Sequence, residues 1–342
     1  MHDSTAAVLV SAVESGDPHA VEKLLVEGAD PNTTFDDDRP PNQPRRVEGR
    51  IGYEGRSRPI LHLAVLLRHE PVVRTLLRLG ASVDLTDQGE LTALALAICS
   101  GQVDVARALL EWDASPEGRY GRSSLLSHVA WASNLDDVAA AEIIRLLVKH
   151  GADVEGGAAE GERTPLMAAA SATHPARVVA LLQVGANPNR TTTQGHTALT
   201  EAFRTSIEGH LRHGRRRQWA PRAVGRALIE GGADPGAGFN PVMLAAQRGR
   251  AKWVRAAIGA GVPVDRSLPD GRTALHLAAS GGFVAAVRAL LEAGADPNAA
   301  DRSGRTALSL VLEEGTGSNP WARSLQVESD LTATIQILEQ VT

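Results

Sequence analysis

The chain has 342 residues, of which 43% are hydrophobic and only 3% aromatic, so its core must be built mainly from Ala, Leu and Val. A net charge of −5 argues against a general binder of nucleic acids or membrane surfaces. The single cysteine, Cys99, excludes an intramolecular disulfide and a cysteine-based zinc cluster.

A five-residue turn recurs along the chain. Its copies are GADPN at Gly28, GASVD at Gly80, DASPE at Asp113, GADVE at Gly151, GANPN at Gly185, GADPG at Gly232, GVPVD at Gly261 and GADPN at Gly294. Successive copies begin 52, 33, 38, 34, 47, 29 and 33 residues apart. A period near 33 residues with occasional insertions predicts an array of stacked repeats.

The copy at residues 271–298 predicts two short helices. Thr273 is an N-cap residue for ALHLAAS, and Gly281 with Gly282 ends that helix. FVAAVRALLEA then predicts a second helix, which Gly294 closes in the left-handed conformation. Two helices of this length cannot bury their apolar faces alone, so neighbouring copies must stack.

These residues resemble the ankyrin repeat. The segments that carry the resemblance are RTPLMAAA from Arg163, QGHTALTEA from Gln194, and LHLA from both Leu61 and Leu275. The resemblance covers nearly the whole chain and implies an all-α solenoid of stacked helix-turn-helix units with hairpin fingers. The implied units are 1–32, 58–89, 90–121, 122–160, 161–193, 194–238, 239–269, 270–303 and 304–342.

We therefore predict one domain, 1–342, with an N-terminal cap repeat at 1–32, internal repeats at 58–303 and a C-terminal cap repeat at 304–342. Such an array, capped at both ends, predicts a monomer. Lysine is nearly absent from the 35 basic residues, which is typical of a protein from a GC-rich bacterium. Without a signal peptide or an apolar run of membrane-spanning length, we expect a cytoplasmic protein with no membrane contact.

Two insertions interrupt the array. The first, 33–57, is a long finger that carries Phe35, Asp37, Asp38 and Tyr53, and it is either a solvated loop or a flap over the groove. The second, 204–222, is rich in arginine and can be a phosphate-binding segment or a solvated helix extension. One basic segment in an acidic chain is weak support for nucleic acid, so we do not expect that partner.

The unit at 122–160 departs from its sisters. Aligned on Ser123, it puts His128 where other units carry a small Ala, and Trp131 on the groove side. His128 is either a hydrogen-bonded structural residue or a ligand-binding one. We expect Trp131 to lie in a long helix-to-helix connection and to pack that insertion against the stack.

The resemblance implies that residues seven and eight after each Thr face the concave groove. They include Leu66, Leu67, Cys99, Ser100, Trp131, Arg204, Gln247 and Arg248, with the carboxylate of Glu201 beside them. Apolar walls with a few polar groups suit a protein partner or a small-molecule pocket. Cys99 is a nucleophile only if a base lies nearby, and otherwise a small groove or core residue.

Two functions compete at this stage. The repeat favours an interaction scaffold that presents its groove and fingers to a protein partner. The alternative is an unusual enzyme or small-molecule binder whose groove is covered by 33–57, with His128, Glu201, Asp37 and Asp38 as candidate acid–base groups. No phosphate loop, metal-ligand spacing or nucleophile motif is present in the sequence, so we expect neither a cofactor nor a metal.

Overall fold

The computed structural model describes residues 2–36, 57–121, 123–156, 162–207, 220–236, 240–315 and 325–341. Most of both insertions lies outside these ranges. So do three candidate residues of the first insertion, Asp37, Asp38 and Tyr53. The described chain groups into two compact units, residues 1–157 with 183–186, and residues 158–182 with 187–342.

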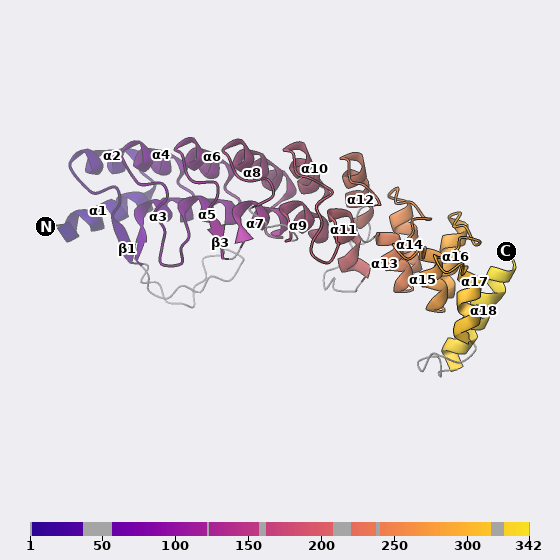
Figure 1. Ribbon diagram of the computed structural model, residues 1–342. Helices are drawn as coiled ribbons and strands as arrows, with labels where there is room; N and C mark the ends of the chain where they lie inside the picture. Colours follow the sequence, from indigo (N-terminus) through magenta and orange to yellow (C-terminus); the bar gives the residue numbers. More distant parts are fainter. Residues whose placement is uncertain are drawn as a thin grey trace. The chain divides into compact units, whose positions relative to one another are not determined.

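The first unit is built from helix pairs. Its helices are α1 (His2–Ser15), α2 (Pro18–Val26), α3 (Ile60–Leu66), α4 (Glu70–Arg78), α5 (Ala93–Cys99), α6 (Val103–Glu111), α7 (Leu125–Trp131) and α8 (Asp137–Lys149). Odd-numbered helices pack side by side in one row and even-numbered helices in another (Figure 1). This is the stacked arrangement that the repeat pattern predicts.

Two hairpins project from the first unit. Strand β1 (Thr34–Asp36) pairs antiparallel with β2 (Ser57–Pro59), and β3 (Arg119–Tyr120) pairs with β4 (Ser123–Ser124). The long finger at 33–57 therefore begins and ends as a paired ladder. Phe35 in β1 is buried at the base of that ladder.

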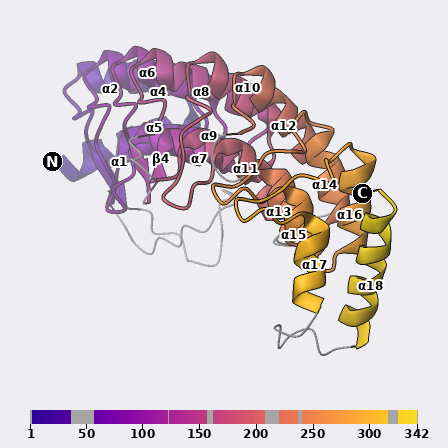
Figure 2. The ribbon, with the colours of Figure 1, turned by 45° about the vertical axis from the view of Figure 1, so that its right-hand side comes forward.

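The second unit repeats the same architecture. Its helices are α9 (Pro165–Ala172), α10 (Pro175–Gln183), α11 (Ala198–Ile207), α12 (Ala220–Glu230), α13 (Pro241–Gln247), α14 (Ala251–Ile258), α15 (Ala274–Ser280), α16 (Val284–Glu292), α17 (Ala307–Gly315) and α18 (Leu325–Glu339). The odd-numbered helices from α9 to α17 form one row, and the even-numbered helices from α12 to α18 form the other (Figure 2). The basic insertion at 204–222 is helical at both described ends, since α11 runs to Ile207 and α12 starts at Ala220.

Local chemistry sets where the helices start and stop. Thr92 and Thr164 each accept a hydrogen bond from the amide three residues later, as N-cap residues do. Turn glycines take positive φ, for example +97° at Gly80 and +85° at Gly294. Asp113 replaces the glycine in one turn and still adopts φ of +60°, a conformation that Asp tolerates better than most residues.

Consecutive turns are joined by a side-chain hydrogen bond that we call a rung. The fifth residue of one turn accepts from the backbone amide of the third residue of the next turn. The rungs join Asn32 to Ser82 (2.8 Å), Asp84 to Ser115 (3.0 Å), Glu117 to Asp153 (2.7 Å), Asn189 to Asp234 (2.7 Å) and Asp265 to Asp296 (3.1 Å). Each rung satisfies a backbone amide that faces the neighbouring repeat.

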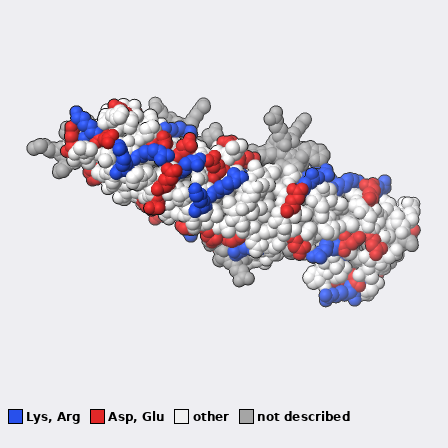
Figure 3. Space-filling model, turned by 90° about the horizontal axis from the view of Figure 1, so that it is seen from above, with Lys and Arg blue, Asp and Glu red and all other residues white. Residues whose placement is uncertain are grey.

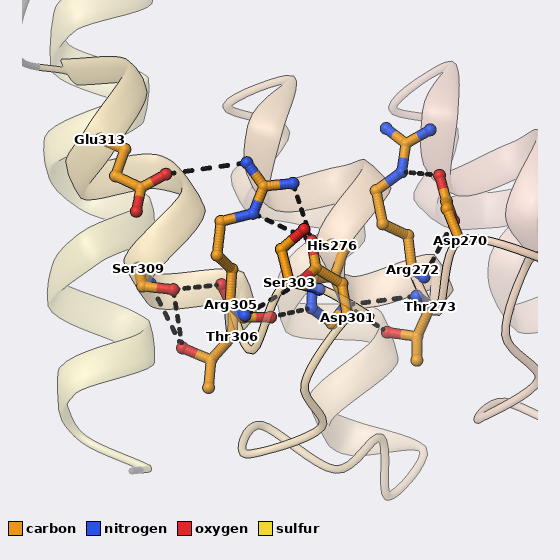
Figure 4. Close-up of polar contacts among 10 residues, drawn as sticks. All are labelled: Asp270, Arg272, Thr273, His276, Asp301, Ser303, Arg305, Thr306, Ser309 and Glu313. Atoms are coloured by element: carbon orange, nitrogen blue, oxygen red, sulfur yellow. Dashed lines mark hydrogen bonds and ion pairs between the residues drawn. The ribbon is translucent and has the colours of Figure 1, made fainter.

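The bases of the fingers are fixed by a second set of contacts (Figure 4). The Nε2 atom of His276 lies 3.0 Å from the carbonyl oxygen of Arg305, which can only accept, so Nε2 is the donor. Nδ1 then accepts from the Thr273 hydroxyl at 2.9 Å. The Asp301 carboxylate accepts hydrogen bonds from the backbone amide of Arg305 at 2.9 Å and from Nη2 of its guanidinium at 2.8 Å. The finger that ends at Arg305 is thereby tied to helix α15 of the preceding repeat.

Ion pairs cross between even-numbered helices. Arg74 pairs with Glu111 at 3.0 Å, and Arg255 pairs with Glu292 at 3.0 Å. Arg107 and Glu142 form a further pair. Basic and acidic side chains are consequently interleaved over this face (Figure 3), which gives it no extended patch of one sign among the residues that the figure colours.

Candidate functional site

The N-caps give the register of the groove-side residues. We number positions from the N-cap of each odd-numbered helix and call positions seven and eight the strip. In α7 the N-cap is Ser124, because its hydroxyl accepts from the Ser127 amide at 3.2 Å. Our alignment on Ser123 was therefore wrong by one residue. Trp131 takes position seven, Ala132 takes position eight, and Ala130 is buried in the core.

The strip is mixed in character within each unit. In the first unit Leu66, Leu67 and Ser100 are half-buried, and Cys99 is buried. In the second unit Gln247 and Arg248 are exposed, and Arg204 is half-buried. Trp131 is the large apolar member, and 51% of its surface is exposed.

An aromatic cluster surrounds His128 in the first unit. The His128 ring lies 4.4 Å from the Tyr120 ring of strand β3 and 5.7 Å, edge-on, from the indole of Trp131. His128 itself is buried. Trp131 ends helix α7 rather than lying in the connection that we expected. Its indole contacts the His128 imidazole, and about half of the surface of Trp131 is open to solvent.

Glu201 is the centre of a charged cluster in the second unit. Its side chain is only 3% exposed, and the guanidinium of Arg204 donates to it through Nε at 2.8 Å and Nη2 at 3.1 Å. Arg163 donates from the neighbouring finger at 2.9 Å, and Nδ1 of His196 lies 3.3 Å away.

The partners of Glu201 decide its protonation. Burial raises the pKa of Glu201, but the hydrogen bonds from Arg204 and the charges of Arg163, Arg204 and His196 outweigh it and hold the pKa below its ordinary value. A general acid at neutral pH needs the opposite shift. The arrangement keeps Glu201 ionised and holds two arginines beside the strip.

His128 and Glu201, our two candidate acid–base groups, occupy the same position in their repeats. Each stands four residues after an N-cap, where α5, α13 and α15 carry Leu96, Leu244 and Leu277. His128 belongs to the first unit and Glu201 to the second. The two side chains are members of separate clusters.

Our sequence reasoning missed Arg163 and His196. Both directly precede the Thr that starts an odd-numbered helix, and Arg272 and Arg305 hold the same place in later repeats. Arg305 also binds a carboxylate from that place, that of Asp301. The recurrent basic residue before the Thr was the signal that could have found them.

Cys99 is buried in α5, and burial raises the pKa of its thiol to about 12. A thiolate nucleophile needs a lowered pKa and an accessible sulfur. Cys99 has neither, so its environment is that of a small core residue rather than a reactive one.

Comparison with protein families identifies the repeat. Residues 9–120 and 221–319 match a family model described as ankyrin repeats in three copies, and residues 161–193 match one for the single ankyrin repeat. A search of the curated proteins found no match. In the part of the chain that the structure describes, no helix combines the length and apolarity needed to cross a bilayer.

Proposed function

Because this chain belongs to the ankyrin repeat family, whose repeats generally serve as protein-interaction modules, we propose that it is a scaffold for a protein partner. The partner contacts strip residues and the fingers beside them. A stack of rigid repeats offers a long surface whose residues vary from repeat to repeat while the framework stays constant. The residues of this chain that we place at the contact are Leu66, Leu67, Ser100, Trp131, Arg204, Gln247 and Arg248, with Cys99 buried beneath them and Phe35 and Tyr53 in the first finger.

The observation that carries the proposal is the half-exposed indole of Trp131. Its indole contacts the His128 ring edge-on at a centroid distance of 5.7 Å, and 51% of the surface of Trp131 is exposed. A rigid, partly exposed aromatic side chain gives up little conformational entropy on binding, and tryptophan is enriched among residues that dominate interface energies.

The enzyme alternative draws no support from Glu201 or Cys99. Glu201 is held ionised by Arg163 and Arg204, and the Cys99 thiol is buried with a raised pKa. Asp37 and Asp38, the remaining acidic candidates, lie outside the described residues.

Capture from a native extract tests the scaffold. The bait is the full chain, compared with Trp131→Ala and with Trp112→Ala as a matched control, because Trp112 is 43% exposed but ends α6 in the other helix row. We expect a stoichiometric protein that survives nuclease treatment, is retained by Trp112→Ala and falls at least about tenfold with Trp131→Ala. Equal retention by both variants would count against the strip as the binding surface.

A further inference from the structure

One finger of the second unit is shorter than its neighbours. Thr197, an N-cap, stands twelve positions after Gly185, and Thr273 stands twelve positions after Gly261. Asn240, the N-cap of α13, stands only eight positions after Gly232. The finger after Gly232 is therefore four residues shorter in sequence than the fingers on either side of it.

The same junction lacks its rung. Gly236 stands where other turns carry Asn, Asp or Glu, so the accepting side chain is missing. The donor position of the next turn is Pro263, which has no backbone N–H. Because the accepting side chain and the donating amide are both absent, the missing rung leaves no backbone amide without a hydrogen-bond partner at this junction.

A pocket of about 550 Å³ lies at this junction. One wall is the tip of the preceding finger, Gln194 and Gly195, and the other is the tip of the following finger, Ser267 to Pro269. Asn240 and the buried Met243 line its base. We call this set, together with Gly236 and Arg266, the finger slot.

Arg266 supplies the charge of the finger slot. A Cβ atom at Gly236 would lie 1.4 Å from Nη2 of Arg266, so the guanidinium occupies the space that a side chain would take. Gly236 does not have positive φ, so the backbone conformation does not require a glycine at this position. The absence of a side chain is what makes room for the Arg266 guanidinium. Arg266 is exposed and, among the residues that the structure describes, forms no ion pair. Asp270, four residues later in the sequence, pairs with Arg272 at 2.7 Å.

We propose that the finger slot receives an extended segment of the protein partner that carries an Asp or Glu, and that this carboxylate pairs with Arg266. The proposal rests on the proposed function and assigns it a specific contact. The occupant lies in the pocket between Gln194 and Gly195 of the preceding finger and Ser267 to Pro269 of the following finger. The thioether of Met243 adapts to the apolar part of the segment, while the guanidinium fixes its acidic residue in a bidentate pair.

Selection with a phage-displayed library of random twelve-residue peptides tests the slot directly. The affinity of the selected peptides is measured for the wild-type chain, for Arg266→Glu and for Ser267→Trp, which fills the slot. Arg302→Glu is the control, since Arg302 is an exposed arginine of the next finger and does not line the slot. We expect the selected peptides to share an acidic residue and to bind at least about tenfold more weakly to the first two variants only.

NMR signals of the methionine methyl groups show where on the chain a selected peptide binds, independently of its affinity. The chain has three methionines, so ¹³C-methyl labelling gives three signals, and a Met243→Leu variant assigns the one at the slot. A selected peptide should shift the Met243 signal and leave that of Met167 in α9 unchanged. Circular dichroism of each variant shows whether it has kept its fold.

Three outcomes overturn the proposal. If the peptides bind all of these variants equally but lose affinity for Trp131→Ala, the proposed scaffold function is retained and the finger slot is excluded as the binding site. A selection that yields no binder to the wild-type chain would exclude a peptide occupant. If sodium citrate alone shifts Met243 and competes away every peptide at the same concentration, the slot is a site for small carboxylates and not for a protein segment.

Discussion

Replacing Glu201 tests how much of the second unit depends on one buried carboxylate. Glu201→Gln keeps the shape of the side chain and removes the charge that Arg163 and Arg204 share. Breaking a buried ion pair from one side costs about 3–5 kcal/mol. Here the arginine side chains are 46% and 28% exposed, so water can solvate the released guanidiniums. We therefore expect a loss of about 1–3 kcal/mol in the free energy of unfolding.

Glu201→Leu is the informative partner variant, because Leu244 and Leu277 occupy the equivalent position in later repeats. A leucine leaves no buried amide without a hydrogen-bond partner, whereas glutamine places its NH₂ group against arginine donors. We expect Glu201→Leu to unfold within about 1 kcal/mol of the wild-type chain.

Urea unfolding followed by circular dichroism measures both variants, and hydrogen exchange of the α11 amides reports the local change, since repeats in an array can unfold separately. The folded pKa of Glu201 is below its ordinary value of 4.5, so its contribution is present above that pH and is lost as the pH falls through the folded pKa. A Glu201→Gln variant as stable as the wild-type chain, or a Glu201→Leu variant less stable than Glu201→Gln, would refute the reasoning.

Three further predictions follow from single contacts. Cys99 should not react with a thiol reagent at pH 8 until the chain unfolds, because its pKa is about 12 and it is buried; rapid labelling of the folded chain would contradict this. Burial lowers the pKa of His62 below 6.5, so the buried neutral imidazole contributes its full stability above that pH and loses it as the pH falls. The melting temperature should therefore drop between pH 7.5 and 5.5, and by less in His62→Gln. Asn189→Ala removes a rung and should cost about 1 kcal/mol, whereas Asn298→Ala, at the same turn position but with no rung, should cost little; equal losses in chemical denaturation would show that rungs contribute nothing.

Much of the fold was accessible from local patterns. The N-cap position of Thr273, the end of α15 before Gly281 and the left-handed turn at Gly294 are confirmed by the structure. The family match confirms the ankyrin resemblance. The register of α7 was wrong because two serines, Ser123 and Ser124, both qualify as N-caps, and only the hydrogen bond to Ser127 distinguishes them.

The candidate site was less accessible, because its contacts join residues that lie far apart in the sequence. Arg163 and Glu201 are 38 residues apart and meet only when one finger packs beside the next helix. The contacts of the His128 ring with Tyr120 and Trp131 likewise depend on how a hairpin folds back over its own helix.

The sequence by itself determined the helix pairs, their caps and the turns between them, because each of these rests on interactions within a few residues of the chain. The stacking of repeats then decided the features that depend on contacts with a neighbouring repeat. These are which carboxylate is buried, which turns are joined by a rung hydrogen bond, and which tryptophan stays exposed to solvent. Those outcomes depend on the packing between repeats, and a periodic sequence specifies that packing only through the residues in which one copy differs from the next.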